Sequence, residues 1–185
     1  MDQKDKKNKL RKEYFSLQSS LPLERKEKAS LRCCQFLESF LADKGNILSF
    51  ASKEGEIDIL PLNESLKRQC RLFLTKVEGN HLSIYHIDPS DPMVLSSFGI
   101  LEPTPSISKK VDVDAIDLFL VPGVCFDSSY HRIGYGKGHI DRLMAKIREK
   151  NPHAKCIGIG FLEQKSANPI PYESHDIPLD DLFLF

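Results

Sequence analysis

Apolar residues recur at helical spacing in four stretches of the chain, and each stretch predicts a helix with one buried face. The apolar stripes are Leu10, Tyr14 and Leu17; then Ala29, Cys33, Phe36, Leu37, Phe40 and Leu41; then Leu62 and Leu66; and lastly Ile140, Leu143, Met144 and Ile147. Pro22 and Pro61 stand where the second and third helices begin, and Gly45 closes the second.

Short apolar runs alternate with these helices and predict strands over residues 47–51, 71–77, 82–87, 116–121 and 156–161. Gly79-Asn80 joins the second run to the third, and Pro122-Gly123 ends the fourth as it would end a central strand. Residues 89–105 contain four prolines and predict a loop. Alternating strands and helices favour the α/β class, with one domain over residues 1–185 and helices on both faces of its sheet.

The composition is that of an ordinary globular protein. Of the 185 residues, 41% are hydrophobic and 28% charged, which excludes a wholly disordered or fibrous chain. Lys plus Arg and Asp plus Glu each number 26, so overall charge gives no attraction to nucleic acid or an anionic membrane. The first twelve residues do carry a basic excess, which indicates either the start of the first helix or a solvated, frayed terminus.

Cysteine usage and hydropathy indicate the compartment. The five cysteines form no Cys-x-x-Cys pair, and an odd number without metal-type spacing favours a reducing environment. No apolar run approaches the roughly eighteen residues that cross a bilayer, and the N-terminus is charged. We therefore expect a cytoplasmic protein without membrane partners.

The densest chemical signal is the segment from Arg132 to Arg142, in which Gly134, Gly136 and Gly138 alternate with other residues. Alternating glycines leave backbone N–H groups open to an anion, and the following helix adds partial positive charge. Arg132 and Lys137 bracket this turn with cations suited to phosphate. The spacing matches neither the Walker pattern nor the dinucleotide fingerprint, so a phosphate site and a plain tight turn both remain open.

Two aspartates are candidate magnesium ligands, because Mg²⁺ between phosphates takes one or two protein carboxylates. Asp141 falls in the first turn of the fourth helix, where a carboxylate also stabilises the helix dipole without any further role. Asp176 precedes Ile177-Pro178, where a plain turn residue is the alternative.

The central block, with Pro122-Gly123, Phe126-Asp127, the glycine turn and Asp141, resembles the 5-formyltetrahydrofolate cyclo-ligase family. The resemblance extends nearly end to end, through Lys7-x-x-x-Arg11, Glu56, the stretch 99–103 and the Asp176 region. It implies a three-layer α/β/α sandwich with a mostly parallel, Rossmann-like sheet. The implied reaction is the ATP- and Mg²⁺-dependent closure of 5-formyltetrahydrofolate to 5,10-methenyltetrahydrofolate, releasing ADP and phosphate. The formyl oxygen is a poor leaving group, so phosphorylation of that oxygen fits a site without a nucleophilic Ser or Cys.

The resemblance also implies roles for particular residues. ATP would contact Lys7, Arg11, Arg132, Ile133, Gly134, Tyr135, Gly136, Lys137, Gly138, His139 and Ile140, with Arg132 and Lys137 acting in catalysis. The folate would contact Ala51, Glu56, Tyr135, Gly136, Lys137, Gly138 and His139. Asp141 and Asp176 would hold Mg²⁺. The expected partners are small molecules, with no nucleic acid, and the expected state is a monomer.

Two features depart from the family pattern, and two other functions remain open. His139-Ile140 stands where the family usually has Tyr-Tyr, and Tyr130 stands where it usually has Gly. A sugar-phosphate isomerase or transferase would use the glycine turn for a monophosphate but has no use for Lys7 and Arg11. A non-enzymatic module binding RNA or nucleotides through the basic N-terminus lacks the interleaved aromatic and basic residues typical of such surfaces. Cys125 is expected to be a small buried residue and not a nucleophile.

Overall fold

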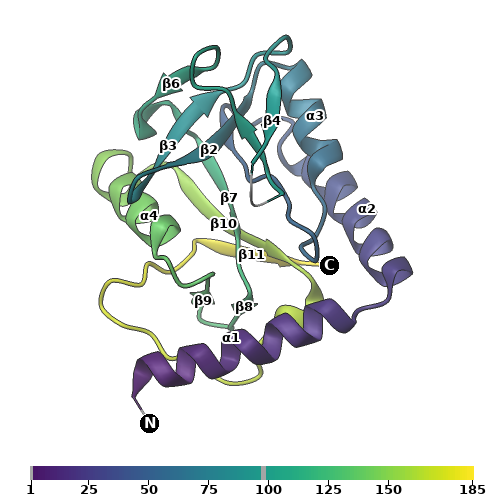
Figure 1. The fold of residues 1–185 in the computed structure, drawn as a ribbon, viewed down its shortest axis with the longest axis vertical. Helices are drawn as coiled ribbons and strands as arrows, with labels where there is room; N and C mark the ends of the chain where they lie inside the picture. Colours follow the sequence, from purple (N-terminus) through teal and green to yellow (C-terminus); the bar gives the residue numbers. More distant parts are fainter. Residues whose placement is uncertain (1, 97–98) are drawn as a thin grey trace.

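The protein is described by a computed structural model that covers residues 2–96 and 99–185. The elements in chain order are α1 (Gln3–Ser20), α2 (Leu23–Phe40), β1 (Ile47–Leu48), α3 (Leu60–Arg68), β2 (Leu72–Glu78), β3 (His81–His86), β4 (Met93–Leu95), β5 (Leu101–Pro103), β6 (Lys109–Val111), the 3₁₀ turn Val113–Ala115, β7 (Leu118–Pro122), β8 (Cys125–Phe126), β9 (Arg132–Ile133), α4 (His139–Lys150), β10 (Lys155–Gly160), the 3₁₀ turn Leu162–Gln164 and β11 (Asp181–Leu184). Figure 1 shows their arrangement.

Within the described residues, seven strands form one sheet in the order β11-β10-β7-β1-β2-β3-β6. The pairs from β11 to β2 are parallel, whereas β3 pairs antiparallel with both β2 and β6. After β1 the chain forms β2 on one side of β1, and later it forms β7 on the other side of β1. Parallel α/β sheets bind ligands where the strand order reverses in this way, at the carboxyl ends of the strands.

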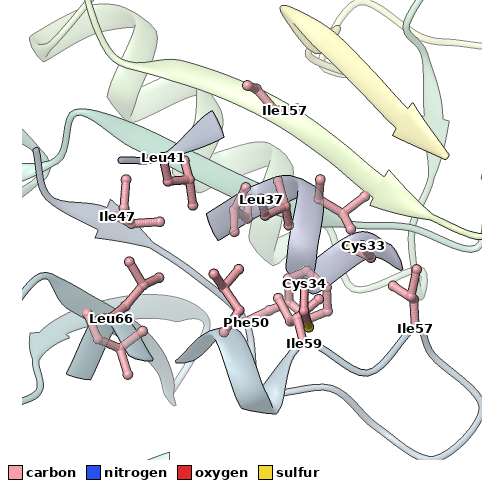
Figure 2. Packing of buried hydrophobic residues seen from close by; sticks show 14 of the residues in the cluster. Cys33, Cys34, Leu37, Leu41, Ile47, Phe50, Ile57, Ile59, Leu66 and Ile157 are labelled. Atoms are coloured by element: carbon pink, nitrogen blue, oxygen red, sulfur yellow. The ribbon is translucent and has the colours of Figure 1, made fainter. Parts of the chain in front are cut away.

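Two buried clusters cover the two faces of the sheet, which gives the predicted three layers. On one face, α2 and α3 pack on β1 and its neighbours, and Figure 2 shows Leu37 and Leu41 of α2 among Ile47, Phe50 and Leu66. On the other face, α4 buries Leu143, Met144 and Ile147 against the sheet. The predicted α/β fold with a mostly parallel sheet is confirmed.

The first helix lies across the edge of the molecule, beneath β8 and β9 in Figure 1, and belongs to neither layer. It is helical from Gln3, with the Asp2 carboxylate accepting a hydrogen bond from Asp5 N at 3.2 Å, so the frayed-terminus alternative is wrong. The predicted apolar stripe is also wrong at Leu17, which is exposed, while Gln18 is buried. Leu10 and Tyr14 of the predicted stripe do pack against the buried cluster of Cys125, Ile133 and Ile170. Lys7 and Arg11 on the same side of the helix line a cavity, and such polar residues carry no hydrophobic periodicity.

The stretch 89–105 was predicted as a loop, but it contains β4 and β5, which pair antiparallel from Met93↔Pro103 to Leu95↔Leu101. These strands have three residues each, too few to show a period of two. Pro103 sits in an edge strand, one of the positions in a sheet that tolerate proline. The helical and strand predictions elsewhere differ from the structure by a few residues at their ends; β1, for example, is shorter than the predicted 47–51.

Candidate active site

A cavity of about 490 Å³ opens at the carboxyl ends of β1 and β7, where the strand order reverses. The residues that follow β1 form one wall, the glycine turn and the start of α4 form another, and α1 and the segment 173–176 close the third side. Among the described residues, six Lys or Arg and five Asp or Glu side chains line it. Eleven charged side chains of a protein with no net charge thus meet in this concave site.

The glycine turn takes backbone conformations that only glycine adopts without strain. Gly136 has φ 95° and Gly138 has φ 63°, both in the left-handed region. A Cβ on Gly136 would also stand 3.4 Å from Cζ of Arg11. Arg11 reaches the turn from α1 and donates from Nε to the carbonyl oxygen of Gly134 at 2.8 Å. The first helix is therefore hydrogen-bonded to the glycine turn, which lines the cavity.

The start of α4 has no side-chain cap. Gly138 is the N-cap residue, and among residues 2–96 and 99–185 no side chain accepts from the first-turn amides in the capping position. These N–H groups carry partial positive charge and bind anions when nothing else takes them. His139 and Ile140 follow at the first two helical positions and line the cavity. Burial lowers the pKa of His139, and the nearby Arg142 and Lys137 lower it further, which favours the neutral imidazole.

Arg132 is the buried cation of the site. It sits on β9, with 7% of the residue exposed, and its Nη2 donates to Oδ1 of Asp141 at 2.8 Å. Its Nε is buried and has no hydrogen-bond partner within the described parts of the chain. Buried polar atoms are rarely left unpaired, so a guanidinium with an unused donor beside a cavity suits an anionic ligand.

The hairpin that presents Arg132 is held by a buried carboxylate. Asp127, only 1% exposed, accepts at Oδ1 from the backbone N–H groups of Ser129 and His131 and at Oδ2 from Ile170 N. Within this loop Tyr130 has φ 64°, a left-handed conformation. The family's usual glycine at this position is explained by that backbone, because glycine adopts it at no steric cost. Tyr130 itself does not line the cavity.

Lys7 links α1 to the C-terminal segment. Its Nζ lies 2.9 Å from Oε2 of Glu173 and also contacts Oδ2 of Asp176. Burial lowers the pKa of Lys7, but the hydrogen bonds to Asp176 and Glu173 outweigh burial and raise that pKa above its ordinary value. Burial raises the pKa of Asp176, but the bonds from Lys7 and from Glu173 N lower it below its usual range overall. Both shifts favour the charged forms of Lys7 and Asp176.

Glu56 and Tyr135 meet on the opposite side of the cavity. The Tyr135 hydroxyl donates to Oε1 of Glu56, and Lys53 N donates to Oε2 at 2.8 Å. Burial raises the pKa of Glu56, although these two donors and the Lys53 charge oppose the shift. The Lys53 ammonium lies 4.0 Å from the centroid of the Tyr135 ring, and Phe15 of α1 packs against the same ring. The wall combines a carboxylate acceptor with an aromatic face, as a flat heterocycle with N–H donors would require.

All fifteen residues predicted for the site line this cavity, although they come from four separate parts of the chain. They are Lys7, Arg11, Ala51, Glu56, Arg132, Ile133, Gly134, Tyr135, Gly136, Lys137, Gly138, His139, Ile140, Asp141 and Asp176. Cys125 is buried, and burial raises the pKa of its thiol to about 12, so it is no nucleophile.

Several lining residues were not predicted from the sequence. Lys53 lies between Ala51 and Glu56, and Glu173 lies three residues before Asp176, so proximity in the sequence could have indicated both. Leu74 and Thr75 of β2 and Glu102 of β5 line the cavity because of the strand order. The sequence carries no local signal for Leu74 and Thr75, whereas Glu102 lies in the stretch 99–103 that carries part of the family resemblance.

A group of possible metal ligands lies beside Lys7. Oxygen or nitrogen atoms of Glu173, His175 and Asp176 lie within 4.8 Å of one another. Asp141 lines the same cavity with its Oδ1 engaged by Arg132. Carboxylate oxygens are the ligands that Mg²⁺ prefers, so the donor set fits this ion, and the two cations now on these carboxylates show that the local field already favours positive charge.

A mostly parallel α/β sheet with a glycine-lined cavity of mixed charge at the reversal of strand order defines the class: an α/β protein with a site suited to a phosphorylated ligand. Residues 3–184 match the model of the 5-formyltetrahydrofolate cyclo-ligase family. The chain belongs to this family of ligases, as the resemblance predicted.

Named relatives and solved structures agree with this assignment. The chain is 28% identical to the probable 5-formyltetrahydrofolate cyclo-ligase of Schizosaccharomyces pombe, in an alignment covering 65% of the chain and 64% of the relative. It is 29% identical to the 5-formyltetrahydrofolate cyclo-ligase of Saccharomyces cerevisiae, in an alignment that covers 80% of the chain and 72% of the relative. The structure of Aquifex aeolicus 5,10-methenyltetrahydrofolate synthetase superposes with a TM-score of 0.81 at 30% identity, covering 95% of the chain and 88% of that protein.

A second solved structure, the synthetase of Mycoplasma pneumoniae, shares the fold with a TM-score of 0.74 at 24% identity, covering 98% of both chains. Family membership favours the ligase hypothesis over the sugar-phosphate isomerase and the non-enzymatic module. Of the helices in the described residues, none has the length and apolar character needed to span a bilayer.

Proposed function

We propose that this chain catalyses the ATP- and Mg²⁺-dependent cyclisation of 5-formyltetrahydrofolate to 5,10-methenyltetrahydrofolate, with release of ADP and phosphate. The observation that carries the proposal is the convergence of Lys7, Arg11, the glycine turn, Glu56 and Tyr135 on one cavity. A site for ATP alone has no need for the Glu56 wall, and a site for folate alone has no need for the cations. The cavity has both the Glu56 wall and the cations.

The triphosphate would occupy the side of the cavity formed by the glycine turn, α4 and α1. Backbone N–H groups from Ile133 to Ile140 and the uncapped start of α4 supply donors, and Lys7 and Arg11 supply charge from α1. Arg132 has an unpaired buried donor here. Asp141 positions the Arg132 guanidinium and Arg11 positions the glycine turn, so these groups are already placed at the cavity when phosphate arrives.

The folate would lie against Ala51, Glu56 and Tyr135, with the turn from Gly136 to His139 between it and the nucleotide. The Glu56 carboxylate accepts hydrogen bonds from the amino and ring N–H groups of the pterin. The Tyr135 hydroxyl keeps that carboxylate oriented in the free protein. Burial of Glu56 makes its hydrogen bonds stronger than they would be in water, and makes an unpaired carboxylate costly.

The chemistry has two steps. The formyl oxygen attacks the γ-phosphorus and ADP leaves, which converts that oxygen into part of a phosphate leaving group. The folate's N10 then attacks the formyl carbon, phosphate departs with the former formyl oxygen, and N10 loses its proton. Arg132 and Lys137 neutralise charge on the phosphoryl group during the first step, and the glycine amides hold its oxygens in line.

Asp141 and Asp176 are the residues that would hold Mg²⁺, with Arg132 and Lys7 released toward phosphate. The metal would add charge neutralisation between the phosphates. The proposal further includes one domain over residues 1–185 and a cytoplasmic monomer acting on small molecules. Its cysteines, Cys33, Cys34, Cys70, Cys125 and Cys156, are all free thiols, in accord with a reducing compartment.

The test is direct. Purified protein is mixed with 5-formyltetrahydrofolate and MgATP, and the near-ultraviolet absorbance of the methenyl product is followed. We expect a rise that requires ATP and metal together. No ATP-dependent rise at high enzyme concentration would contradict the proposed function.

A further inference from the structure

Lys7 is held by two carboxylates, and one of them, Glu173, belongs to the group of possible metal ligands but is not one of the two aspartates proposed to hold Mg²⁺. Its Oε2 lies 2.9 Å from the Lys7 ammonium, and Asp176 contacts the same ammonium. The Lys7 side chain is 13% exposed, against 42% for Glu173. A cation placed to reach a triphosphate is thus already engaged by competing anions from the other end of the chain.

The two carboxylates form a fixed pair and not a chance surface contact. Glu173 N donates to Oδ2 of Asp176 at 2.7 Å, so the backbone of one holds the side chain of the other. One ammonium lies between two carboxylates, which leaves a local excess of one negative charge. Any phosphate that approaches Lys7 must therefore approach Glu173 and Asp176 as well.

We propose that Glu173 is a positioning residue that competes with nucleotide phosphate for Lys7, and so makes tight nucleotide binding depend on a divalent cation. The inference rests on the proposed function, because it takes ATP as the ligand of the cavity. When Lys7 turns to phosphate, Glu173 and Asp176 both face the triphosphate without their cation. The negative charges of these carboxylates and of the triphosphate then repel each other. A divalent ion on Asp176 offsets this repulsion. Without the ion, the repulsion between the carboxylates and the triphosphate is uncompensated.

The proposal makes a specific prediction for Glu173→Gln, which keeps the shape of the side chain and removes its charge. Lys7 then loses one competitor but keeps Asp176, so the link between α1 and the C-terminal segment survives. Metal-free ATP should bind more tightly to the variant, and MgATP affinity should change little. The Kd for metal-free ATP divided by the Kd for MgATP should therefore be smaller in the variant than in wild type.

The experiment is calorimetric titration of the full chain with ATP, once in EDTA and once in excess Mg²⁺. We expect Glu173→Gln to lower the metal-free Kd about fivefold, within the range of a partly exposed ion pair, and to change the Kd for MgATP less than twofold. Glu149→Gln, on the exposed last turns of α4 and away from the cavity, removes the same charge and should change neither value. A metal-free Kd within twofold of wild type, or a weaker one, would overturn the inference.

Two further arms separate this inference from the proposed function. Asp176→Asn should weaken MgATP binding and lose most of the metal dependence, because it removes the proposed ligand. A wild-type protein that binds no ATP in either buffer would overturn the inference and the proposed function together. A wild type that forms methenyl product while Glu173→Gln leaves the ratio of dissociation constants unchanged would overturn the inference alone.

Discussion

Arg132 donates to Asp141 at 2.8 Å from a side chain that is 2% exposed, and the acceptor stands in the first turn of α4. The pair joins the β8–β9 hairpin to the helix and orients the guanidinium toward the cavity. A buried cation and a proposed metal ligand thus stabilise each other before any ligand binds. The relationship gives Asp141 a structural part as well as a proposed catalytic one.

Asp141→Asn should therefore lower the free energy of unfolding. Removing one partner of a fully buried pair costs about 3–5 kcal/mol, and because Asp141 is 20% exposed we expect about 2 kcal/mol. Urea denaturation at pH 7 measures the change. Glu149→Gln, an exposed acid on the same helix, serves as the control and should shift stability little. If Asp141→Asn lowers the free energy of unfolding no more than the control does, the pair does not stabilise the fold as proposed, and water replaces the carboxylate at Arg132.

Lys137→Ala should separate function from stability. Lys137 is exposed on the glycine turn and lines the cavity, so its loss should leave the fold intact. We expect kcat/KM to fall about 100- to 1000-fold, the usual cost of removing one group that stabilises transferring charge. Lys12→Ala removes a lysine on an exposed position of α1 outside the cavity and should retain normal rates. A rate within threefold of wild type for Lys137→Ala would place the phosphoryl transfer elsewhere.

The raised pKa of Glu56 predicts a pH-dependent term in stability. Because burial favours the protonated carboxyl, Glu56 stabilises the folded state fully below its unfolded pKa of about 4.3, and this contribution disappears as pH rises through the higher folded pKa. Glu56→Gln removes the term. The free energy of unfolding of the variant minus that of wild type should therefore increase from pH 4 to pH 7, as measured by urea denaturation in a pH series. A difference that stays flat or decreases would contradict the assigned shift.

Replacing the buried Gln18 with an apolar side chain should stabilise the protein. It is 4% exposed, and its Nε2 has no hydrogen-bond partner in the part of the chain that the structure describes. An unpaired buried amide costs about 1–3 kcal/mol, so Gln18→Met, which keeps the length of the side chain, should raise the free energy of unfolding by about 1 kcal/mol. Chemical denaturation tests this. Destabilisation would mean that Gln18 has a partner, such as a bound water.

Much of the fold followed from the sequence because it depends on apolar periodicity. The faces of α2 and α4, and the strand over residues 116–121, bury hydrophobic side chains in a central sheet, and their spacing records this. The inward face of α1 was not predictable in the same way. Lys7 and Arg11 lie on the inward side of that helix because a cavity lies beneath them, whereas Gln18, farther along the helix, is buried away from that cavity.

The site residues were predictable as a set because several motifs occur in family order, but their pairing was not. The sequence predicted a phosphate contact for Arg132 and a metal-binding role for Asp141, but not a contact between them. The β8–β9 hairpin brings Nη2 of Arg132 to 2.8 Å from Oδ1 of Asp141. The same holds for Lys7 and Glu173, which lie 166 positions apart in the chain. Long-range ion pairs leave no local pattern, so the link that closes the cavity could be found only in three dimensions.

The central claim is that this chain activates the formyl oxygen by phosphorylation within the cavity. Its most direct test uses 5-formyltetrahydrofolate labelled with ¹⁸O in the formyl group, incubated with MgATP and the enzyme, with mass analysis of the released phosphate. The account predicts one labelled oxygen in the phosphate for each methenyl product formed. Product formation with unlabelled phosphate, or ATP hydrolysis without product, would contradict it.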